Sequence, residues 1–374
     1  MPQAPQTVFG AFKATFHAIF TDSAVLMVMI GAVVLYSFFY PLAYQEQVAA
    51  NQPIMVVDHD ASNLSRELIR HIQSLRAVHV VAVVKDSNLA IEAMRSMKIQ
   101  GYVEIDHGFE RDIYRTVPGQ VALFANGAWL GRASTVLNAL ADAITSFAEQ
   151  TALKQAAFTG AGLRPALNLV ARPLFNTQEG YGSSLVTGVA ELIIQQTMLV
   201  GLAVLVGTRR ELYGRVVLSH KQTLGAYLAA TFIGTINMLY YVGFVFWYQA
   251  YPQAGSLTTV VFSAVLFVMA VVALGLFLTS FFTTRERAYQ LILVTTLPLF
   301  FLSNLSWPAT ATPQWLVLLS KLIPSTAGIN LMIKTTQFGA SWNEARTELI
   351  NLLGLILLYG GLGWWRYTRQ RQEK

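Results

Sequence analysis

The sequence predicts an α-helical integral membrane protein with six transmembrane helices and an extracytoplasmic mixed α/β domain inserted between helices 1 and 2. Two observations on composition support this fold class. Of the 374 residues, 54% are hydrophobic and only 12% are charged, whereas soluble proteins have about 25% charged residues. The charges are also concentrated, because residues 43–183 hold 25 of the 46 charged side chains. These features exclude a single soluble domain, a disordered chain and a coiled coil.

An amphipathic helix is expected within residues 1–23. Phe9, Phe12, Phe16 and Phe20 recur at spacings of three and four residues, which places them on one helical face. Such a helix would lie in the cytoplasmic interface of the membrane. The alternative is that these residues simply extend the first span.

Six stretches are apolar enough to cross the hydrocarbon core of a bilayer, which requires about 20 residues. Five of them carry no charge, and the second carries one acid, Glu191. The six stretches are residues 24–42, 184–206, 224–248, 257–282, 288–307 and 349–365. The first is longer than the apolar region of a signal peptide, so we expect it to remain as a span.

The positions of Lys and Arg predict the orientation, because short basic loops stay in the cytoplasm. Segments 207–223 and 283–287 and the tail 366–374 are basic, whereas loop 249–256 has no charge. These three basic segments share one side only if both termini are cytoplasmic. The domain 43–183 then lies outside, together with 308–348, which is expected to be a loop or a re-entrant segment.

Within the inserted domain, strand-like and helix-like runs alternate, which predicts helices packed on a small sheet. The expected strands are 54–57, 78–84, 101–105 and 121–124, and the expected helices are 64–75, 88–97, 109–114 and 130–158. Asp58, Asp60 and Ser62 resemble the start of a calcium loop. However, Asn63 and Ile69 replace the Gly and Glu that such a loop needs. We therefore expect turn and capping chemistry here and no metal site.

The motifs of energy-coupled and covalent catalysis are missing from the sequence. It has no Gly-Lys pair of a phosphate-binding loop, no Gly-x-Ser-x-Gly and no cysteine. We therefore expect no enzymatic activity and no cofactor in this chain. Any driven work would take its energy from a partner or from an ion gradient.

Four segments together resemble the membrane subunits of ABC-2 type exporters, in the branch with a large periplasmic domain between the first two transmembrane helices. They are residues 56–65, 101–109, 172–176, and 302–304 followed by Pro308, Pro313 and Pro324. Two features depart from the family pattern. Loop 211–215 lacks the usual Gly-Thr, and Asn304 stands where Gly is common.

The resemblance implies a permease subunit of an ATP-binding cassette exporter in the bacterial inner membrane. Its cargo would be a hydrophobic or amphipathic small molecule, either drug-like or lipid-like. The implied partners are an ATP-binding subunit that holds ATP and Mg, a second identical or paralogous permease, and a periplasmic membrane-fusion adaptor. Two other functions stay open: a membrane-anchored, receptor-like interaction protein without transport activity, and an ion-coupled transporter. The last is disfavoured, because only one ionisable group lies in the spans.

The resemblance also suggests which residues carry the function. The residues expected to couple to the ATPase are Arg209, Arg210, Glu211, Gly214 and Arg215, although positive-inside topology alone also explains the charges of this loop. The translocation path is expected along spans two and five, with a kink at Pro298. Its candidate lining residues are Glu191, Gln195, Met198, Thr295, Thr296 and Phe300.

Glu191 and Gln195 are four residues apart and form a polar stripe on the second span. One interpretation is that this stripe faces the cargo or a second permease subunit. The other is that Glu191 lies near the outer interface, where it reaches lipid headgroups or packs on the polar domain.

Overall fold

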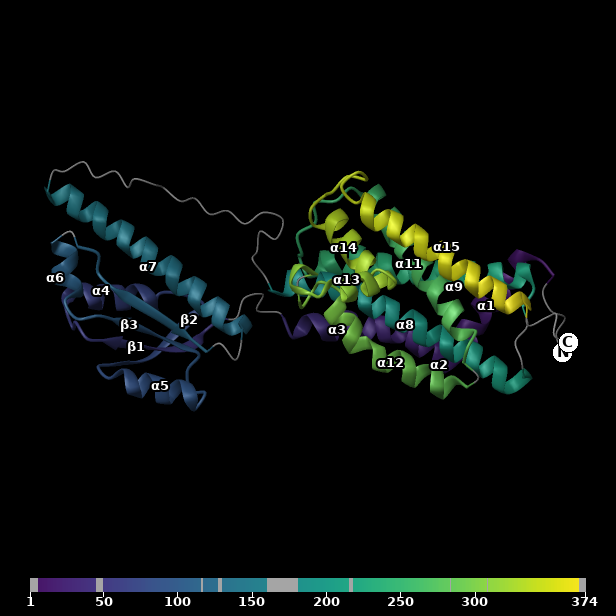
Figure 1. Cartoon of the computed structure of the whole chain (residues 1–374), viewed down its shortest axis with the longest axis horizontal. Coiled ribbons are helices and arrows are strands. Elements are labelled where there is room, and N and C mark those ends of the chain that lie inside the picture. The colour runs from purple at the N-terminus through teal and green to yellow at the C-terminus, as the bar shows by residue number, and fades with distance from the viewer. Residues whose placement is uncertain are drawn as a thin grey trace. The chain divides into compact units, whose positions relative to one another are not determined.

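A computed structural model describes residues 6–44, 50–115, 117–126, 130–159, 181–214, 218–282, 284–307 and 309–369. The chain divides into two compact units. The first comprises Met1–Gln45 and Pro173–Lys374, and the second comprises Glu46–Arg172. In the described residues the first unit consists of helices, and the second contains the sheet (Figure 1).

The first half of the helical unit contains α1 (Val8–Thr21), α2 (Ser23–Leu26), the π-helical segment η1 (Met27–Gly31), α3 (Ala32–Leu42), α8 (Tyr181–Tyr213), α9 (His220–Leu239), the π-helical segment η2 (Tyr240–Val245) and α10 (Phe246–Tyr248). It continues with α11 (Leu257–Thr279), α12 (Arg285–Leu302), the short 3-10 turn η3 (Ala309–Ala311), α13 (Gln314–Ser320), α14 (Pro324–Thr336) and α15 (Arg346–Arg369).

Five helical stretches in the described part of the chain are long and apolar enough to cross a membrane. They are Ser23–Leu42, Gly182–Tyr213, His220–Tyr248, Leu257–Thr279 and Arg346–Thr368. Each corresponds to a span that the sequence predicts. The predicted fifth span falls on α12, where the apolar helix Ile292–Leu302 is shorter. The bent pair α13 and α14 is a further candidate, so the count of six stays a prediction.

The amphipathic helix at the N-terminus forms as a helix of its own. Asp22 has an extended backbone between α1 and α2, and its side chain accepts from the amides of Ala24 and Val25. The Phe12 and Phe16 rings contact the Phe232 ring of α9, with ring centres 6.1 and 6.3 Å apart. α1 is therefore not an extension of the first span, and its aromatic face packs partly on α9.

The two π-helical segments are stabilised by side-chain amides. The wider turn of a π-helix leaves backbone carbonyls poorly paired, which is costly in apolar surroundings. Asn237 donates from Nδ2 to the carbonyl of Met29 at 2.7 Å, and Gln253 donates from Nε2 to that of Val242 at 2.9 Å. Each amide thus binds a carbonyl inside a π-helical segment.

The second unit contains β1 (Gln52–Asp58), α4 (Asn63–Gln73), β2 (Val78–Val84), α5 (Ser87–Arg95), β3 (Gly101–Ile105), α6 (Phe109–Tyr114), β4 (Val121–Ala125) and α7 (Leu130–Thr159). The sheet has the order β2-β1-β3-β4. β1 pairs in parallel with β2 and β3, and β4 is antiparallel to β3. The predicted mixed α/β domain is confirmed in its elements.

Alternate residues of β1 supply the cores on the two faces of the sheet. Ile54 and Val56 pack with buried residues of α4 and α7, whereas Met55 and Val57 pack with Ala90 of α5. Figure 1 shows α4 and α7 on one side of the strands and α5 on the other. The connecting helices therefore change faces of the sheet between β1 and β3. Open α/β sheets commonly bind ligands at the carboxyl ends of the strands at such a switch point.

Candidate functional site

A line of buried polar side chains follows α8 where it packs on α14. We call it the α8–α14 seam, and its members are Ser183, Thr187, Glu191, Gln195, Ser325 and Gln337. At one end, Gln337 donates from Nε2 to Oγ1 of Thr187 at 2.6 Å and to the Ser183 carbonyl at 3.1 Å. At the other end, the Ser325 amide donates to Oε1 of Gln195 at 2.8 Å. The spacing of four residues keeps these groups on one face of α8.

Glu191 lies in the middle of this seam and is only 1% exposed. Its Oε2 atom has no hydrogen-bond partner among the residues that the structure describes. Packed helices surround the Glu191 side chain and leave it no contact with lipid headgroups, and whether it faces the cargo, a second permease subunit or the polar domain stays a prediction. Glu191 and Gln195 do lie on one face of α8, and Gln195 contacts α14 of the bent pair.

A sharp bend brings the start of α14 to this seam. α13 and α14 meet at 84°, and Pro324 begins α14. Proline suits the first position of a helix, where an unpaired amide would otherwise remain. The bend turns the first amides of α14 toward α8, and Gln195 accepts from one of them.

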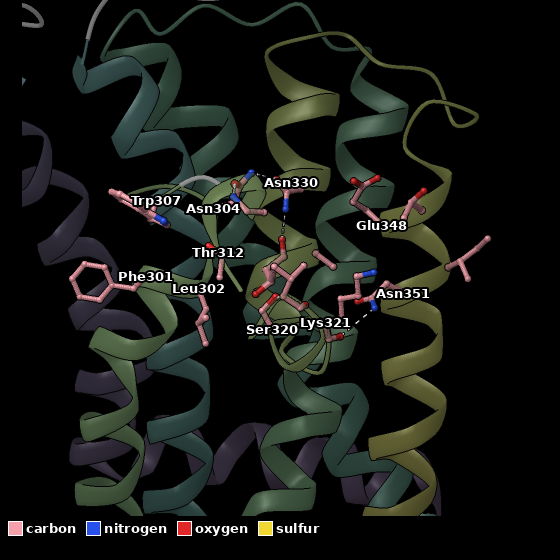
Figure 2. Close-up of a pocket in the computed structure, with 16 residues that line it drawn as sticks. Phe301, Leu302, Asn304, Trp307, Thr312, Ser320, Lys321, Asn330, Glu348 and Asn351 are labelled. Carbon is pink, nitrogen blue, oxygen red and sulfur yellow. Dashed lines mark hydrogen bonds between the residues drawn. The ribbon is translucent and has the colours of Figure 1, made fainter. Parts of the chain in front are cut away.

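A cavity of about 380 Å³ lies between the end of α12, the bent pair and α15. Figure 2 shows its lining. One part of the lining is apolar and includes Phe301, Leu302, Trp307, Val317 and Ile350. Another part is polar and includes Asn304, Lys321, Asn330, Glu348 and Asn351. Amphipathic walls of this kind are typical of sites for small ligands.

Hydrogen bonds hold the polar wall in place. Lys334 binds Oε1 of Glu348 at 2.8 Å, and Asn351 donates to the carbonyl of Lys321 at 3.1 Å. Asn304 adopts a left-handed backbone with φ of 69° and accepts from the amide of Ala309 at 2.7 Å. Asparagine tolerates this conformation better than most residues, so it fits a position where the left-handed backbone would also suit glycine.

The sequence analysis does not predict this cavity, because Lys321, Asn330 and Glu348 fall in the segment 308–348, expected to be a loop or re-entrant, and Asn304 and Asn351 fall at the ends of two predicted spans. Pro308, Pro313 and Pro324 belong to the family pattern and do not by themselves indicate a cavity. The signal that could have located the site is the i, i+3 spacing of Glu348 and Asn351 at the start of the last apolar helix.

The end of the bundle near residue 213 holds the candidate coupling residues. Arg209, Arg210 and Glu211 lie on the last turns of α8 rather than in a separate loop, and Gly214 ends the helix with φ of 77°. Arg215 lies outside the described residues. Leu212 and Tyr213 between them are 68% and 70% exposed.

Contacts join this end of α8 to the other two basic segments. Glu211 accepts from the backbone amide of Arg285, the first residue of α12, at 3.1 Å. Arg210 donates to the carbonyl of Ser280 at 3.4 Å, and Arg366 donates to its hydroxyl at 2.9 Å. The three basic segments therefore converge at one end of the helical unit, which is the arrangement that the predicted orientation requires.

The remaining path candidates are not gathered into one lining. Met198 is fully buried in the core beside Gly234 of α9. Thr295, Thr296 and Phe300 are half-buried on α12, and Pro298 is exposed. α12 continues through Pro298 as one helix. A path between spans two and five therefore remains a prediction.

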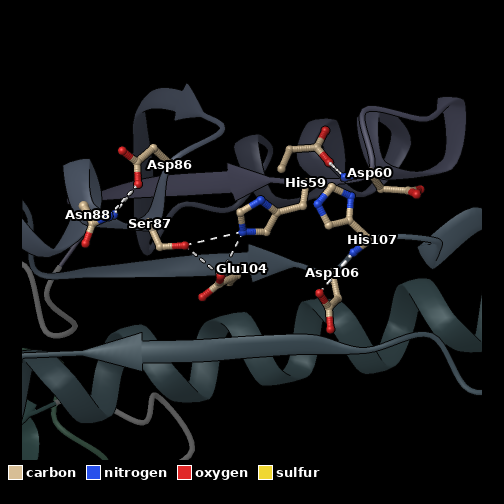
Figure 3. Close-up of polar contacts among 9 residues, drawn as sticks. His59, Asp60, Asp86, Ser87, Asn88, Glu104, Asp106 and His107 are labelled. Atoms are coloured by element: carbon tan, nitrogen blue, oxygen red, sulfur yellow. Dashed lines mark hydrogen bonds and ion pairs between the residues drawn. The ribbon is translucent and has the colours of Figure 1, made fainter.

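The inserted domain carries a second polar cluster, at the carboxyl ends of its parallel strands (Figure 3). His59 contacts Oε1 of Glu104 through Nε2 at 2.9 Å, and Ser87 donates to the same oxygen at 2.7 Å. These hydrogen bonds from Ser87 and His59 lower the pKa of Glu104. The Ser87 proton is directed to the carboxylate rather than to the imidazole, so the cluster is not arranged as a nucleophile and base.

The aspartates that resemble a calcium loop serve the turn instead. Asp58 accepts from the amides of Asp60 and Ala61 at 3.1 and 2.9 Å and from the Ser65 hydroxyl at 2.8 Å. Partial burial would raise the pKa of Asp60, but hydrogen bonds from Ser62 and from the amides of Glu110 and Gly108 outweigh it and lower the pKa. The predicted turn and capping chemistry is confirmed.

Comparison with known proteins identifies relatives over most of the chain. Residues 23–365 match the model of the ABC-2 family transporter proteins. The chain is also 23% identical over 305 residues to the "Probable multidrug ABC transporter permease YbhR" of Escherichia coli strain K12, covering 79% of this chain and 80% of the relative. The protein of the same name from Escherichia coli O157:H7 gives the same values.

Proposed function

The chain belongs to the ABC-2 family of transporter proteins, and from this premise we propose that it is the transmembrane permease subunit of an ATP-binding cassette exporter. The proposed cargo is a hydrophobic or amphipathic small molecule that leaves the cytoplasm or the inner membrane. ATP is hydrolysed on a separate subunit. The family match over nearly the whole chain carries this proposal, and the relative named as a probable multidrug permease supports a drug-like cargo.

The proposed docking surface for the ATP-binding subunit is the end of α8. It combines the half-buried Arg209 and Arg210 with two exposed residues, Leu212 and Tyr213. Arg and Tyr are enriched in protein interfaces, where a charged rim surrounds an apolar contact. Exposed apolar side chains next to arginines therefore support a docking role beyond positive-inside topology.

The proposed transmission runs from this surface into α12. Because Glu211 holds the first amide of α12, a push on the end of α8 moves the start of α12 as well. At the far end of α8, the α8–α14 seam couples the same helix to the bent pair beside the cavity. ATP-driven closure of the ATP-binding subunits would then open the cavity and the translocation path first to one side of the membrane and then to the other.

The proposed setting is the bacterial inner membrane, with both termini in the cytoplasm and the inserted domain in the periplasm. A second permease, identical or paralogous, completes the transporter, and the inserted domain contacts a periplasmic adaptor. The convergence of the three basic segments at one end of the bundle supports this orientation.

Co-purification and export in the same cells test the proposal. We expect an ATP-binding protein to co-purify with the permease in mild detergent, and Arg209→Glu/Arg210→Glu to abolish both co-purification and export. Arg346→Glu, an exposed arginine at the other end of the bundle, is the matched control and should leave both intact. Absence of an ATP-binding partner from the wild-type preparation would overturn the proposal.

A further inference from the structure

We propose that the cavity between α12, α13, α14 and α15 binds an amphiphile whose head is an ammonium group with N–H hydrogens. This inference rests on the proposed function, because it names the chemical class that the permease would accept. It is carried by two buried oxygen atoms on the polar wall of the cavity. They belong to Glu348 and Asn351, which lie one turn apart on α15.

Both oxygens are hydrogen-bond acceptors without a donor. Oε2 of Glu348 and Oδ1 of Asn351 are buried and have no hydrogen-bond partner within the described ranges. The amide of Asn351 cannot be turned over, because its other atom bonds the Lys321 carbonyl, which only accepts. Oε1 of Glu348 is bound by Lys334, so the carboxylate too is fixed in orientation.

Three amide and indole donors of the lining are already bonded, whereas the Thr326 hydroxyl, which can donate or accept, has no partner in the described part of the chain. Asn304 donates to Asn330 at 3.4 Å, Asn330 to the Thr326 carbonyl at 2.8 Å, and Trp307 to the Ala311 carbonyl at 3.3 Å. The Lys321 side chain is exposed, and water solvates its charge. The Glu348 and Asn351 oxygens only accept, so a head that binds them must supply hydrogens, and a charged donor forms the stronger bond to a carboxylate.

The apolar wall accommodates the body of the same ligand. Figure 2 shows Phe301 and Trp307 on the side of the cavity away from Glu348 and Asn351. A head bound at the two acceptors would direct its tail between these rings and Leu302. The volume of about 380 Å³ accommodates a head and part of a tail, within the range of small-molecule pockets.

Two probes of equal charge and chain length test the need for N–H hydrogens. Dodecylammonium carries three such hydrogens, and dodecyltrimethylammonium carries none. Native mass spectrometry of the purified permease in a neutral detergent measures the binding of each. We expect wild type to prefer dodecylammonium about tenfold or more, the effect of one charged hydrogen bond.

Variants of the cavity should remove this preference. Glu348→Gln removes the carboxylate and Asn351→Leu removes the amide acceptor, and each should reduce dodecylammonium binding to the level of the quaternary probe. Val317→Trp fills the cavity and changes neither acceptor, and it should also reduce dodecylammonium binding. This variant tests the inference if Glu348→Gln fails to fold. The control is Glu344→Gln, a glutamate outside the cavity lining, which should bind as wild type does.

Analysis of the lipids that co-purify with the permease distinguishes two sources of the ammonium group, an aminophospholipid and an exported amine. Retention of phosphatidylethanolamine but not phosphatidylcholine through purification would identify an aminophospholipid, and dodecylammonium binding without such lipid would identify an exported amine. Equal affinity for both dodecyl probes, unchanged by Glu348→Gln, would overturn the inference. The binding assay uses the permease without an ATPase, so it does not depend on the proposed ATP-driven export. Failure of ligand binding can therefore be distinguished from failure of the proposed function.

Discussion

Glu191 shows how a single side chain depends on its helical neighbours. Thr187 and Gln195, one turn away on either side, are hydrogen-bonded across the α8–α14 seam, but Glu191 Oε2 has no partner in the described part of the chain. An unpaired charge buried among apolar helices is unfavourable by several kcal/mol. A neutral side chain of the same shape is therefore the tolerated replacement.

This leads to a prediction for two substitutions at Glu191. Glu191→Gln keeps the shape without a charge and should lower the free energy of unfolding by no more than about 1.5 kcal/mol, or raise it. Glu191→Lys introduces an uncompensated charge and should destabilise the protein by about 3 kcal/mol or more. Thermal unfolding of the purified permease measures both, and a folded, fully stable Glu191→Lys variant would contradict the buried position.

Asn304 supplies both a backbone conformation and a hydrogen bond after α12. Asn304→Ala should destabilise the protein by about 1–2 kcal/mol, because alanine tolerates left-handed φ poorly and cannot bind the Ala309 amide. Asn304→Gly should restore the backbone preference and lose only the hydrogen bond. An Asn304→Ala variant that unfolds at the same temperature as Asn304→Gly, or at a higher one, would show that φ does not limit this position.

At the scale of helices, close packing of α8 on α12 depends on Gly207. A Cβ atom at this position would lie 2.7 Å from Cα of Arg285, so any larger side chain must separate the two backbones. The Glu211 contact with α12 lies one turn further along α8. The same pair of helices is thus joined by a steric contact and by a polar one.

Separating these helices should weaken coupling between ATP hydrolysis and export. Gly207→Val should destabilise the protein by about 1–3 kcal/mol and lower export per ATP hydrolysed in reconstituted vesicles. Gly354→Val serves as the control, because nothing lies within 4 Å of its added Cβ. Unchanged export by Gly207→Val would show that α12 does not follow the end of α8.

For the whole molecule, the orientation can be tested with cysteines, since the chain has none of its own. Lys98→Cys lies in the inserted domain and Lys221→Cys lies at the start of α9, and both positions are exposed. A membrane-impermeant thiol reagent should label Lys98→Cys in spheroplasts and should label Lys221→Cys only after the membrane is opened. Reversed labelling would place the termini outside.

Sequence alone determined the features that depend on neighbouring residues. Runs of apolar residues predicted five of the helices that can span a membrane, and alternating runs predicted the elements of the inserted domain. The backbone amides that Asp58 and Asp22 bind lie within three residues of each aspartate. Hydrophobic length and side-chain capping are local properties, so they can be recognised without knowing what packs on them.

Only the tertiary structure decided where Glu191 lies, that α13 and α14 form a bent pair, and that Glu348 and Asn351 face a cavity. The Ser325–Gln195 hydrogen bond joins residues 130 positions apart, and the Asn351–Lys321 bond joins residues 30 apart. Polar residues in such apolar surroundings are positioned by the partners they find, because an unpaired polar group is costly there. Those partners come from distant helices, and only the packing of the helices brings them together.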